Sequence, residues 1–438
     1  MATPLADRLR AAFGSSLRAT AAAPPPPNNG GLRSPPLLGG GGADRDIDEL
    51  PGIEIQTPAG PCLLYEERYP LDHRHGGVEL GACLELPALA FACLAKNVGL
   101  TEVDLSQGVF LDAETTGLAG GTGTTAFLVG IAHFAMGEPV GAPSAFVIRQ
   151  FFMRDFAEER AMLLALAEAL EPFRYVLTFN GKSFDLPLLE TRYVLARLAR
   201  RWQPDLHFDL LHPARRLWRT RLEGCSLAVL EEAVLGHRRD ADVPSWAIPG
   251  LYVAYLQRGD VGALRRVFSH NRHDLLSLAA LATHLGRRLA DPLAAGLGPD
   301  ELLGVARLYE QLGLQAEARA CLEAALAGAT HGSPVRPRVQ LVLALYCKRA
   351  GHRDRALQLW RELAVGPGAL PGLIELAKHH EHQRRDPAAA LEVVEQALAI
   401  VELREARDGA SCWRAERTDL ERRLARLLRK RSPPAVSL

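Results

Sequence analysis

The chain has 438 residues, of which 48% are hydrophobic and 23% are charged. At ~100–200 residues per domain this length predicts two or three folded units, and the composition is that of a globular protein, which excludes disorder of the whole chain. The 51 basic and 51 acidic residues give a formal net charge of zero. This balance excludes a strongly basic nucleic-acid coat and an acidic tail protein, although a sum cannot exclude local basic patches.

Seven cysteines are too few for a disulfide scaffold, and none of them forms a C-x-x-C motif. Free thiols are typical of the reducing cytosol, so we expect a cytoplasmic protein. The longest apolar run, residues 86–95, is about half of the ~18 residues that a membrane span needs, so we expect no membrane partner.

The N-terminal part of the chain is expected to precede the folded units. Residues 1–43 carry proline and glycine tracts that bury too little apolar surface to fold, which predicts a disordered leader. Residues 44–107 are expected to form an N-terminal extension, with a short hairpin around Pro58–Pro61 and a mainly helical stretch over residues 80–100.

Residues 108–290 alternate between short apolar runs and helical periodicities, and we expect one domain there. Strands are predicted near residues 109–111, 127–132, 145–148, 175–178 and 206–209, and helices over residues 158–170 and 184–198. Three consecutive strands followed by alternating helices and strands predict an α/β fold, in which helices flank a mixed sheet.

Residues 300–438 show no strand pattern but a weak internal repeat. The spacings from Ala318 to Ala356 and from Ala356 to Ala390 are 38 and 34 residues. Small residues that recur about every 34 residues are typical of a tetratricopeptide-like, all-α solenoid. Such arrays bind peptides, so we expect a protein partner there. An irregular helical bundle is the alternative.

Two carboxylates lie at the end of the first strand of the expected α/β domain. Asp112 and Glu114 are two residues apart, so their side chains share one face of the strand. Adjacent carboxylates repel each other unless a cation lies between them. Oxygen ligands favour Mg²⁺ or Mn²⁺ over zinc. The pair is therefore a candidate metal site.

Two further motifs add carboxylates to the candidate set. Asp185 follows the Asn180-Gly181 turn and is predicted in the first turn of a helix, where the helix dipole favours a carboxylate. His270 and Asp274 are four residues apart and would share one helix face, which suits a metal ligand with a general base one turn away. Taken singly, each motif is also explained by an ordinary helix end.

Together and in this order, the three motifs resemble the DEDD superfamily of 3′–5′ exonucleases, which have the ribonuclease H-like fold. Residues 50–290 resemble more narrowly the YprB-type ribonuclease H-like family, through the stretches Leu111–Thr124 and Thr178–Asp185. The resemblance covers about half of the chain, and the helical tail fits the tetratricopeptide repeats of some relatives.

The resemblance implies a two-metal hydrolysis of phosphodiester bonds in single-stranded DNA or RNA. In the family the four carboxylates that match Asp112, Glu114, Asp185 and Asp274 hold two Mg²⁺ or Mn²⁺ ions. One branch of the superfamily has a tyrosine where this chain has His270, and the other has a histidine where this chain has Ser269. We therefore expect His270 as the general base. Its residue type, histidine, is that of the second branch, whereas its position four residues before Asp274 is that of the tyrosine in the first branch.

Substrate contacts are expected beside these carboxylates and on a basic helix. Asn180 and Thr115 adjoin the carboxylate motifs. Arg215, Trp218 and Arg219 would share one helix face, where arginines contact phosphates and an indole stacks on an unpaired base. A solvated helix with Trp218 buried is the alternative.

Two other functions fit the same residues. One is endonuclease or junction-cleaving activity on the same fold. The other is a catalytically weak or inactive nucleic-acid-binding adaptor that recruits protein partners through its repeats. A pseudo-enzyme would be expected to lack at least one carboxylate, so the presence of all four favours a metal-dependent phosphodiesterase.

Overall fold

A computed structural model of the chain describes residues 50–100, 102–117, 122–137, 141–199, 202–366 and 368–431. The expected leader (residues 1–43) and residues 118–121 of the first motif stretch lie outside this range. The described chain forms two compact units. The first contains residues 50–215 and 224–290, and the second contains Arg216–Glu223 and the residues from Asp291 onward.

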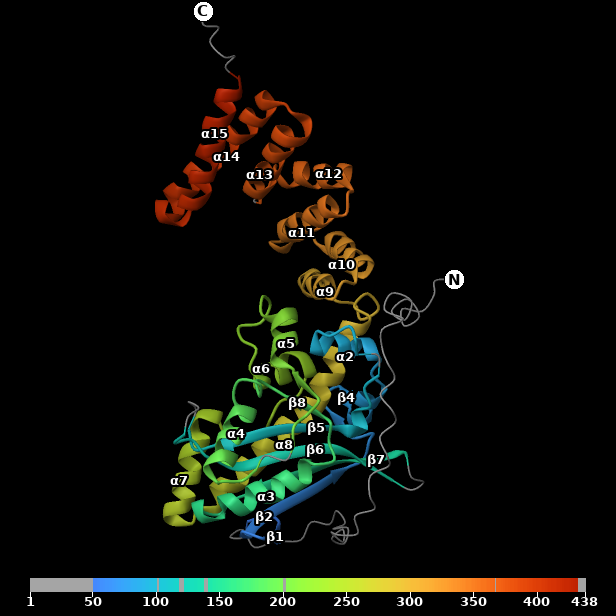
Figure 1. Cartoon of the computed structure of the whole chain (residues 1–438), viewed down its shortest axis with the longest axis vertical. Coiled ribbons are helices and arrows are strands. Elements are labelled where there is room, and N and C mark those ends of the chain that lie inside the picture. The colour runs from blue at the N-terminus through green and yellow to red at the C-terminus, as the bar shows by residue number, and fades with distance from the viewer. Residues whose placement is uncertain are drawn as a thin grey trace, which may run out of the picture. The chain divides into compact units, whose positions relative to one another are not determined.

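The first unit is built on a seven-stranded mixed sheet with the order β1-β2-β7-β6-β5-β8-β9 (Figure 1). The strands are β1 (Ile53–Thr57), β2 (Gly60–Tyr69), β5 (Gly108–Thr115), β6 (Ala126–Met136), β7 (Pro143–Phe152), β8 (Tyr175–Thr178) and β9 (Leu206–Asp209). Neighbours from β1 to β5 are antiparallel, whereas β8 pairs in parallel with β5 and with β9. This confirms the predicted mixed sheet.

The hairpin of β1 and β2 belongs to the same sheet, because β2 pairs with β7 over seven residue pairs from Leu63 to Tyr69. The N-terminal extension therefore lengthens the sheet. A second, two-stranded sheet joins β3 (Arg74–His75) to β4 (Val78–Glu79).

Helices cover both faces of the large sheet, so its central strands are apolar almost throughout. The helices between residues 80 and 290 are η1 (Leu80–Glu85), α2 (Ala88–Ala95), η2 (Leu105–Gln107), η3 (Phe156–Glu158), α3 (Glu159–Leu170), α4 (Asp185–Leu195), α5 (Leu211–Trp218), α6 (Leu227–Leu230), η4 (Glu231–Leu235), η5 (Ser245–Ala247), α7 (Ile248–Arg258) and α8 (Val261–Ala290). The helical stretch expected over residues 80–100 is two short helices, separated at Pro87, whose backbone is extended.

The helix α8, which carries the candidate residues His270 and Asp274, packs over strand β5, which carries Asp112 and Glu114. It packs against β5, β6 and β7, while α3 packs against β1, β2 and β7 on the opposite face (Figure 1). The core between sheet and helices includes a stacked pair of rings, Phe127 and Tyr252, with centroids 4.1 Å apart. Such pairs hold α7 and β6 together through dispersion and apolar burial.

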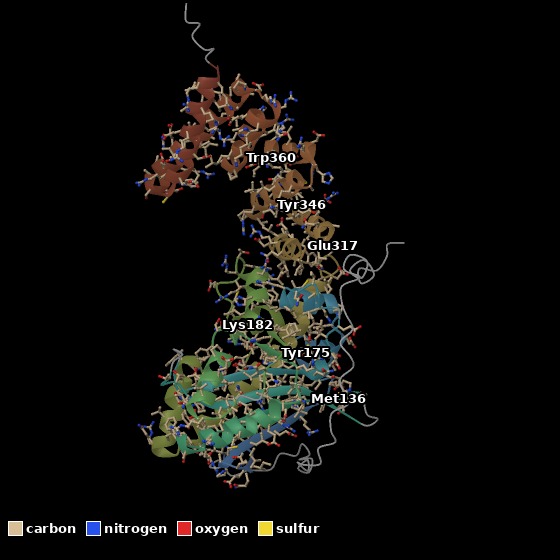
Figure 2. The ribbon with its side chains drawn as sticks, viewed as in Figure 1. Met136, Tyr175, Lys182, Glu317, Tyr346 and Trp360 are labelled. Carbon is tan, nitrogen blue, oxygen red and sulfur yellow. The ribbon has the colours of Figure 1, made fainter. Side chains whose placement is uncertain are left out.

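The second unit is all α-helical over its described residues, as predicted. Its helices are α9 (Pro299–Gln311), α10 (Gln315–Gly328), α11 (Val335–Arg349), α12 (Arg353–Leu363), α13 (Ala369–His379), η6 (His380–Arg384), α14 (Pro387–Asp408), η7 (Ala410–Cys412) and α15 (Arg414–Arg431). Successive helices pack in pairs, and Tyr346 and Trp360 lie on the middle pair (Figure 2).

The weak sequence repeat has a structural counterpart in these pairs. Ala318, Ala356 and Ala390 are fully buried on α10, α12 and α14, where a small side chain lets helices approach closely. Gly313 and Gly351 follow the first helix of their pairs with left-handed φ values of 76° and 82°, a conformation that glycine adopts without steric cost. The tetratricopeptide character of the repeats stays a prediction.

No described helix combines the length and the apolar character that crossing a membrane requires.

Candidate active site

A pocket of about 460 Å³ in the first unit brings the three sequence motifs together. Its lining includes all four candidate carboxylates and the candidate base: Asp112, Glu114, Asp185, His270 and Asp274. They come from β5, α4 and α8, which are far apart in the sequence. Clustered acids in a cleft are a candidate site for cation chemistry.

The two carboxylates of β5 share a strand face, as predicted, and Glu114 is buried, as is Asp185 at the start of α4. Glu114 is 8% exposed and Asp185 is 5% exposed. Burial, followed by the negative charges of Asp274 and Asp185, raises the pKa of Asp112 well above its usual range. Burial and the charge of Asp112 do the same to the pKa of Glu114. Burial, opposed by backbone hydrogen bonds, raises the pKa of Asp185 to about 7.

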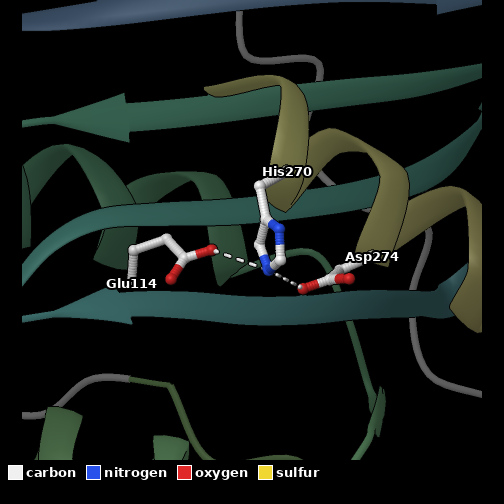
Figure 3. Close-up of side chains that lie close together, drawn as sticks. All are labelled: Glu114, His270 and Asp274. Carbon is white, nitrogen blue, oxygen red and sulfur yellow. Dashed lines mark ion pairs between the residues drawn. The ribbon is translucent and has the colours of Figure 1, made fainter. Parts of the chain in front are cut away.

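His270 lies between two of the carboxylates. Its Nε2 atom is 4.0 Å from Glu114 Oε1 and 3.5 Å from Asp274 Oδ2 (Figure 3). On the other side of the ring, Nδ1 is 2.9 Å from Asp242 Oδ1. An Nδ1–H that donates to Asp242 leaves the Nε2 lone pair directed toward the site, where it can accept a proton.

The donor set fits a hard divalent cation. Glu114, His270 and Asp274 each offer one atom within 4.8 Å of the other two. The buried Oε1 atom of Glu114 has no hydrogen-bond partner. A buried carboxylate oxygen without a partner is costly, and a Mg²⁺- or Mn²⁺-like ion bound there would satisfy it.

Asn271 and Gln150 complete the site, and the sequence motifs did not identify them. Asn271 Nδ2 donates to Asp112 Oδ2 at 2.8 Å, and Gln150 Nε2 donates to Asn271 Oδ1 at 2.8 Å. Both side chains are fully buried. Gly130 on β6 pairs with Asp112 on β5. A Cβ atom added at Gly130 would lie 2.0 Å from Asn271 Oδ1. A glycine in a buried strand opposite the acid was the available signal.

A second set of residues comes from the segment between η4 and η5, where the sequence shows only a loop. Arg239 Nη1 donates to Asp242 Oδ2 at 3.0 Å, and Nη2 contacts Asp274 Oδ1. Arg239 Nε donates to Glu231 Oε2 at 2.7 Å. Ser245 Oγ lies 3.4 Å from His270 Nε2. The contacts of Arg239 with Asp274 and of Ser245 with His270 join positions 35 and 25 residues apart, which no local spacing pattern indicates.

The expected substrate contacts are only partly brought together. Thr115, Asn180 and Arg215 line the pocket. Asn180 also makes the turn after β8, with a left-handed φ of 69°. Its backbone N–H donates to buried Asp209, at 2.9 Å, so the turn that presents Asp185 is anchored to β9.

Trp218 and Arg219 do not line the pocket. Both belong to the second unit. Trp218 is fully buried, and its indole N–H donates to Glu301 Oε1 at 2.7 Å. This burial corrects the expectation that Trp218 stacks on a base, because a ring without exposed surface cannot receive one. It corresponds to the alternative of a helix with Trp218 buried.

The pocket also has an apolar part. It is lined by Phe179, Phe184, Leu211, Leu227 and Ile248. Trp246 follows the lining residue Ser245 in the chain; it does not line the pocket itself, and it is 73% exposed. Carboxylates and apolar groups in one pocket, with the rings of Phe179 and Phe184 among them, suit a ligand that has both a phosphate and a flat base.

A mixed sheet flanked by helices, with carboxylates from its central strand, a strand–helix junction and a late helix, defines a ribonuclease H-like protein. Residues 109–286 match the RNase_H superfamily, and this segment contains all the candidate carboxylates. Superfamily membership supports a nuclease-type function, and such nucleases generally use divalent metals.

Over 376 residues the chain is 31% identical to "Uncharacterized protein YprB" of Bacillus subtilis (strain 168), a match that covers 85% of this chain and 86% of that relative. The chain therefore belongs to the YprB family of ribonuclease H-like proteins, which confirms the resemblance seen in its motifs.

Proposed function

We propose that the protein is a metal-dependent phosphodiesterase that degrades single-stranded DNA or RNA, as a 3′–5′ exonuclease. The convergence of Asp112, Glu114, Asp185 and Asp274 in one pocket, with Glu114 Oε1 buried and without a hydrogen-bond partner, carries this proposal. These carboxylates would hold two Mg²⁺ or Mn²⁺ ions, which acidify water and stabilise negative charge on a phosphate.

The protein's own groups would orient the reaction and move the proton. His270 would accept the proton of the attacking water at Nε2, while Asp242 holds the ring through Nδ1. Asn271 would keep the Asp112 carboxylate in one orientation. Arg215 on the pocket lining would contact a substrate phosphate.

The rings of Phe179 and Phe184 on the pocket lining, and the exposed Trp246 beside the lining residue Ser245, favour an unpaired substrate. A base in a duplex is already stacked and paired, so its faces are not free to contact the rings of Phe179, Phe184 or Trp246. A single strand offers one free face per base, and stacking on an aromatic ring stabilises it without regard to sequence.

The adaptor function predicts nucleic-acid binding without hydrolysis, together with a protein partner on α9–α15. It shares the fold with the nuclease and differs in chemistry. The four carboxylates in one pocket favour the nuclease, because a binding protein has no need for desolvated acids that repel the phosphate backbone.

The test is digestion of end-labelled single- and double-stranded DNA and RNA with Mn²⁺, and with EDTA in place of the metal. We expect shortening of labelled single strands by the wild type, abolished by EDTA and by Asp112→Asn. The matched control is Asp205→Asn, at an exposed ion pair with Arg174, which should cleave like the wild type. Cleavage retained in Asp112→Asn would refute the site, and binding without cleavage by the wild type would favour the adaptor.

A further inference from the structure

Arg239 is a buried cation among the acids of the candidate site. Its side chain is 7% exposed, and it forms ion pairs with Glu231, Asp242 and Asp274. These acids come from η4, from the same loop as Arg239 and from α8. Burial alone would lower the pKa of this guanidinium, but the charges of Asp274 and Glu231 raise it, so Arg239 stays charged. One guanidinium therefore joins three segments of chain around the pocket.

The two carboxylate oxygens of Asp274 have different neighbours. Oδ1 accepts from Arg239 Nη2, while Oδ2 lies 3.5 Å from His270 Nε2, on the side of Glu114. A carboxylate held through one oxygen by a planar fork loses rotational freedom. Its second oxygen stays available to a cation.

The same guanidinium also acts on His270. Arg239 Nη1 donates to Asp242 Oδ2 at 3.0 Å, and Asp242 Oδ1 in turn lies 2.9 Å from His270 Nδ1. His270 and Asp274 are one turn apart on α8. Arg239 thus contacts Asp274 directly, and it reaches His270 both through Asp242 and through Nη1, which lies 3.3 Å from His270 Nδ1.

We propose that Arg239 is the positioning residue of the metal site, which orients Asp274 directly and His270 both directly and through Asp242. The inference rests on the proposed metal-dependent function. Glu231 and Asp242 place two further carboxylates next to the four that line the pocket, and Arg239 offsets their charge so that they do not compete for the cation or repel the phosphate. Residues that orient metal ligands affect metal affinity or activity by about 10–100-fold.

The alternative is that Arg239 competes with the metal for Asp274, as a built-in substitute cation. Arg239→Lys separates the two. Lysine keeps the positive charge but has no planar fork, so it cannot bind Glu231, Asp242 and Asp274 together. Positioning predicts weaker Mn²⁺ binding in this variant, whereas competition predicts equal or tighter binding.

The experiment measures free Mn²⁺ by electron paramagnetic resonance during titration of the full chain, without substrate. We expect Arg239→Lys to bind Mn²⁺ about 10-fold or more weakly than the wild type. The matched control is Arg192→Lys, at another largely buried arginine, paired with Glu159 at 2.5 Å, and its affinity should equal that of the wild type. Circular dichroism checks that each variant is folded. Wild-type or tighter affinity in Arg239→Lys would overturn the proposal.

A second variant tests the path to His270 and does not touch the core. Asp242 is partly exposed, so Asp242→Asn is expected to fold. It should keep the Mn²⁺ affinity within about twofold and lower kcat about 10-fold or more, with little change in KM. Unchanged kcat would overturn this part of the proposal. If the wild type binds no Mn²⁺ at all, the proposed function itself fails, an outcome distinct from equal binding by wild type and variant.

Discussion

The Asn271 carboxamide donates to Asp112 Oδ2 at 2.8 Å and to the Asp112 carbonyl oxygen at 3.3 Å. One side chain of α8 thereby binds both the backbone and the carboxylate of the central strand. Gln150 on β7 fixes the orientation of this amide. The helix and the sheet are locked at the point where the acids meet.

Gly130→Ala tests this locking. The added Cβ atom would lie 2.0 Å from Asn271 Oδ1 and 2.8 Å from Leu275 Cδ1, so α8 must shift away from β6. We expect a loss of about 1–3 kcal/mol in the free energy of unfolding, typical of an overpacked core, and a loss of hydrolysis larger than the loss of stability explains. Urea denaturation and the digestion assay measure the two. Gly262→Ala, near the start of α8, has nothing closer than 3.8 Å and serves as the control; an equal loss there would argue against the locking contact.

His270→Ala separates a base from a metal ligand. If His270 takes the proton of the attacking water, the rate should fall about 10²–10⁴-fold while Mn²⁺ affinity stays near that of the wild type. Its Nε2 atom is also close enough to Glu114 and Asp274 to share a cation with them. A parallel loss of Mn²⁺ affinity would make His270 a ligand, and full activity would remove it from the reaction.

Trp246→Ala tests the single-strand preference. Loss of one stacked base is worth about 1–3 kcal/mol, or about 5–150-fold in affinity. We expect this weakening for single-stranded oligonucleotides and little change for duplexes, measured by fluorescence anisotropy in the Asp112→Asn background to prevent cleavage. Phe156→Ala removes another exposed ring, 57% exposed, whose neighbours in the chain, unlike Ser245 beside Trp246, do not line the pocket. Equal effects of the two variants, or none for Trp246→Ala, would contradict a stacking role.

The stability of the first unit should fall in mild acid because it buries neutral histidines. Burial lowers the pKa of His133 to about 4, and its Nε2 atom has no partner. Between pH 6.5 and 4 the unfolded chain binds a proton there and the folded chain does not, so this stability is present above pH 6.5 and is lost as the pH falls. A phenylalanine at position 133 would keep the ring contact with Phe173 but cannot be protonated. Between pH 7 and 5 the free energy of unfolding, measured by urea denaturation, should therefore fall by about 2 kcal/mol less in His133→Phe than in the wild type. Parallel pH profiles would contradict this assignment.

Local patterns in the sequence were sufficient to predict the strands and the spacing of the acids. The strand expected over residues 175–178 has those bounds, as does that over residues 206–209, because alternation and apolar runs are properties of neighbouring residues. The mainly helical stretch expected over residues 80–100 consists of two short helices, because the backbone at Pro87 is extended. The hairpin joins the main sheet through β7, which no local pattern indicates.

The sequence by itself therefore determined the chemistry available to this protein: Asp112 and Glu114 on one strand face, Asp185 at a helix start, and His270 one turn from Asp274. Only the tertiary structure decided that these groups share one pocket, that Asn271 and Arg239 hold them there, and that Trp218 is buried while Trp246 is exposed. The physical reason is the sequence separation over which the interactions act. Backbone periodicity is set by nearest neighbours, whereas the meeting of α8, β5 and the Arg239 loop depends on packing between segments more than a hundred residues apart or without any periodicity.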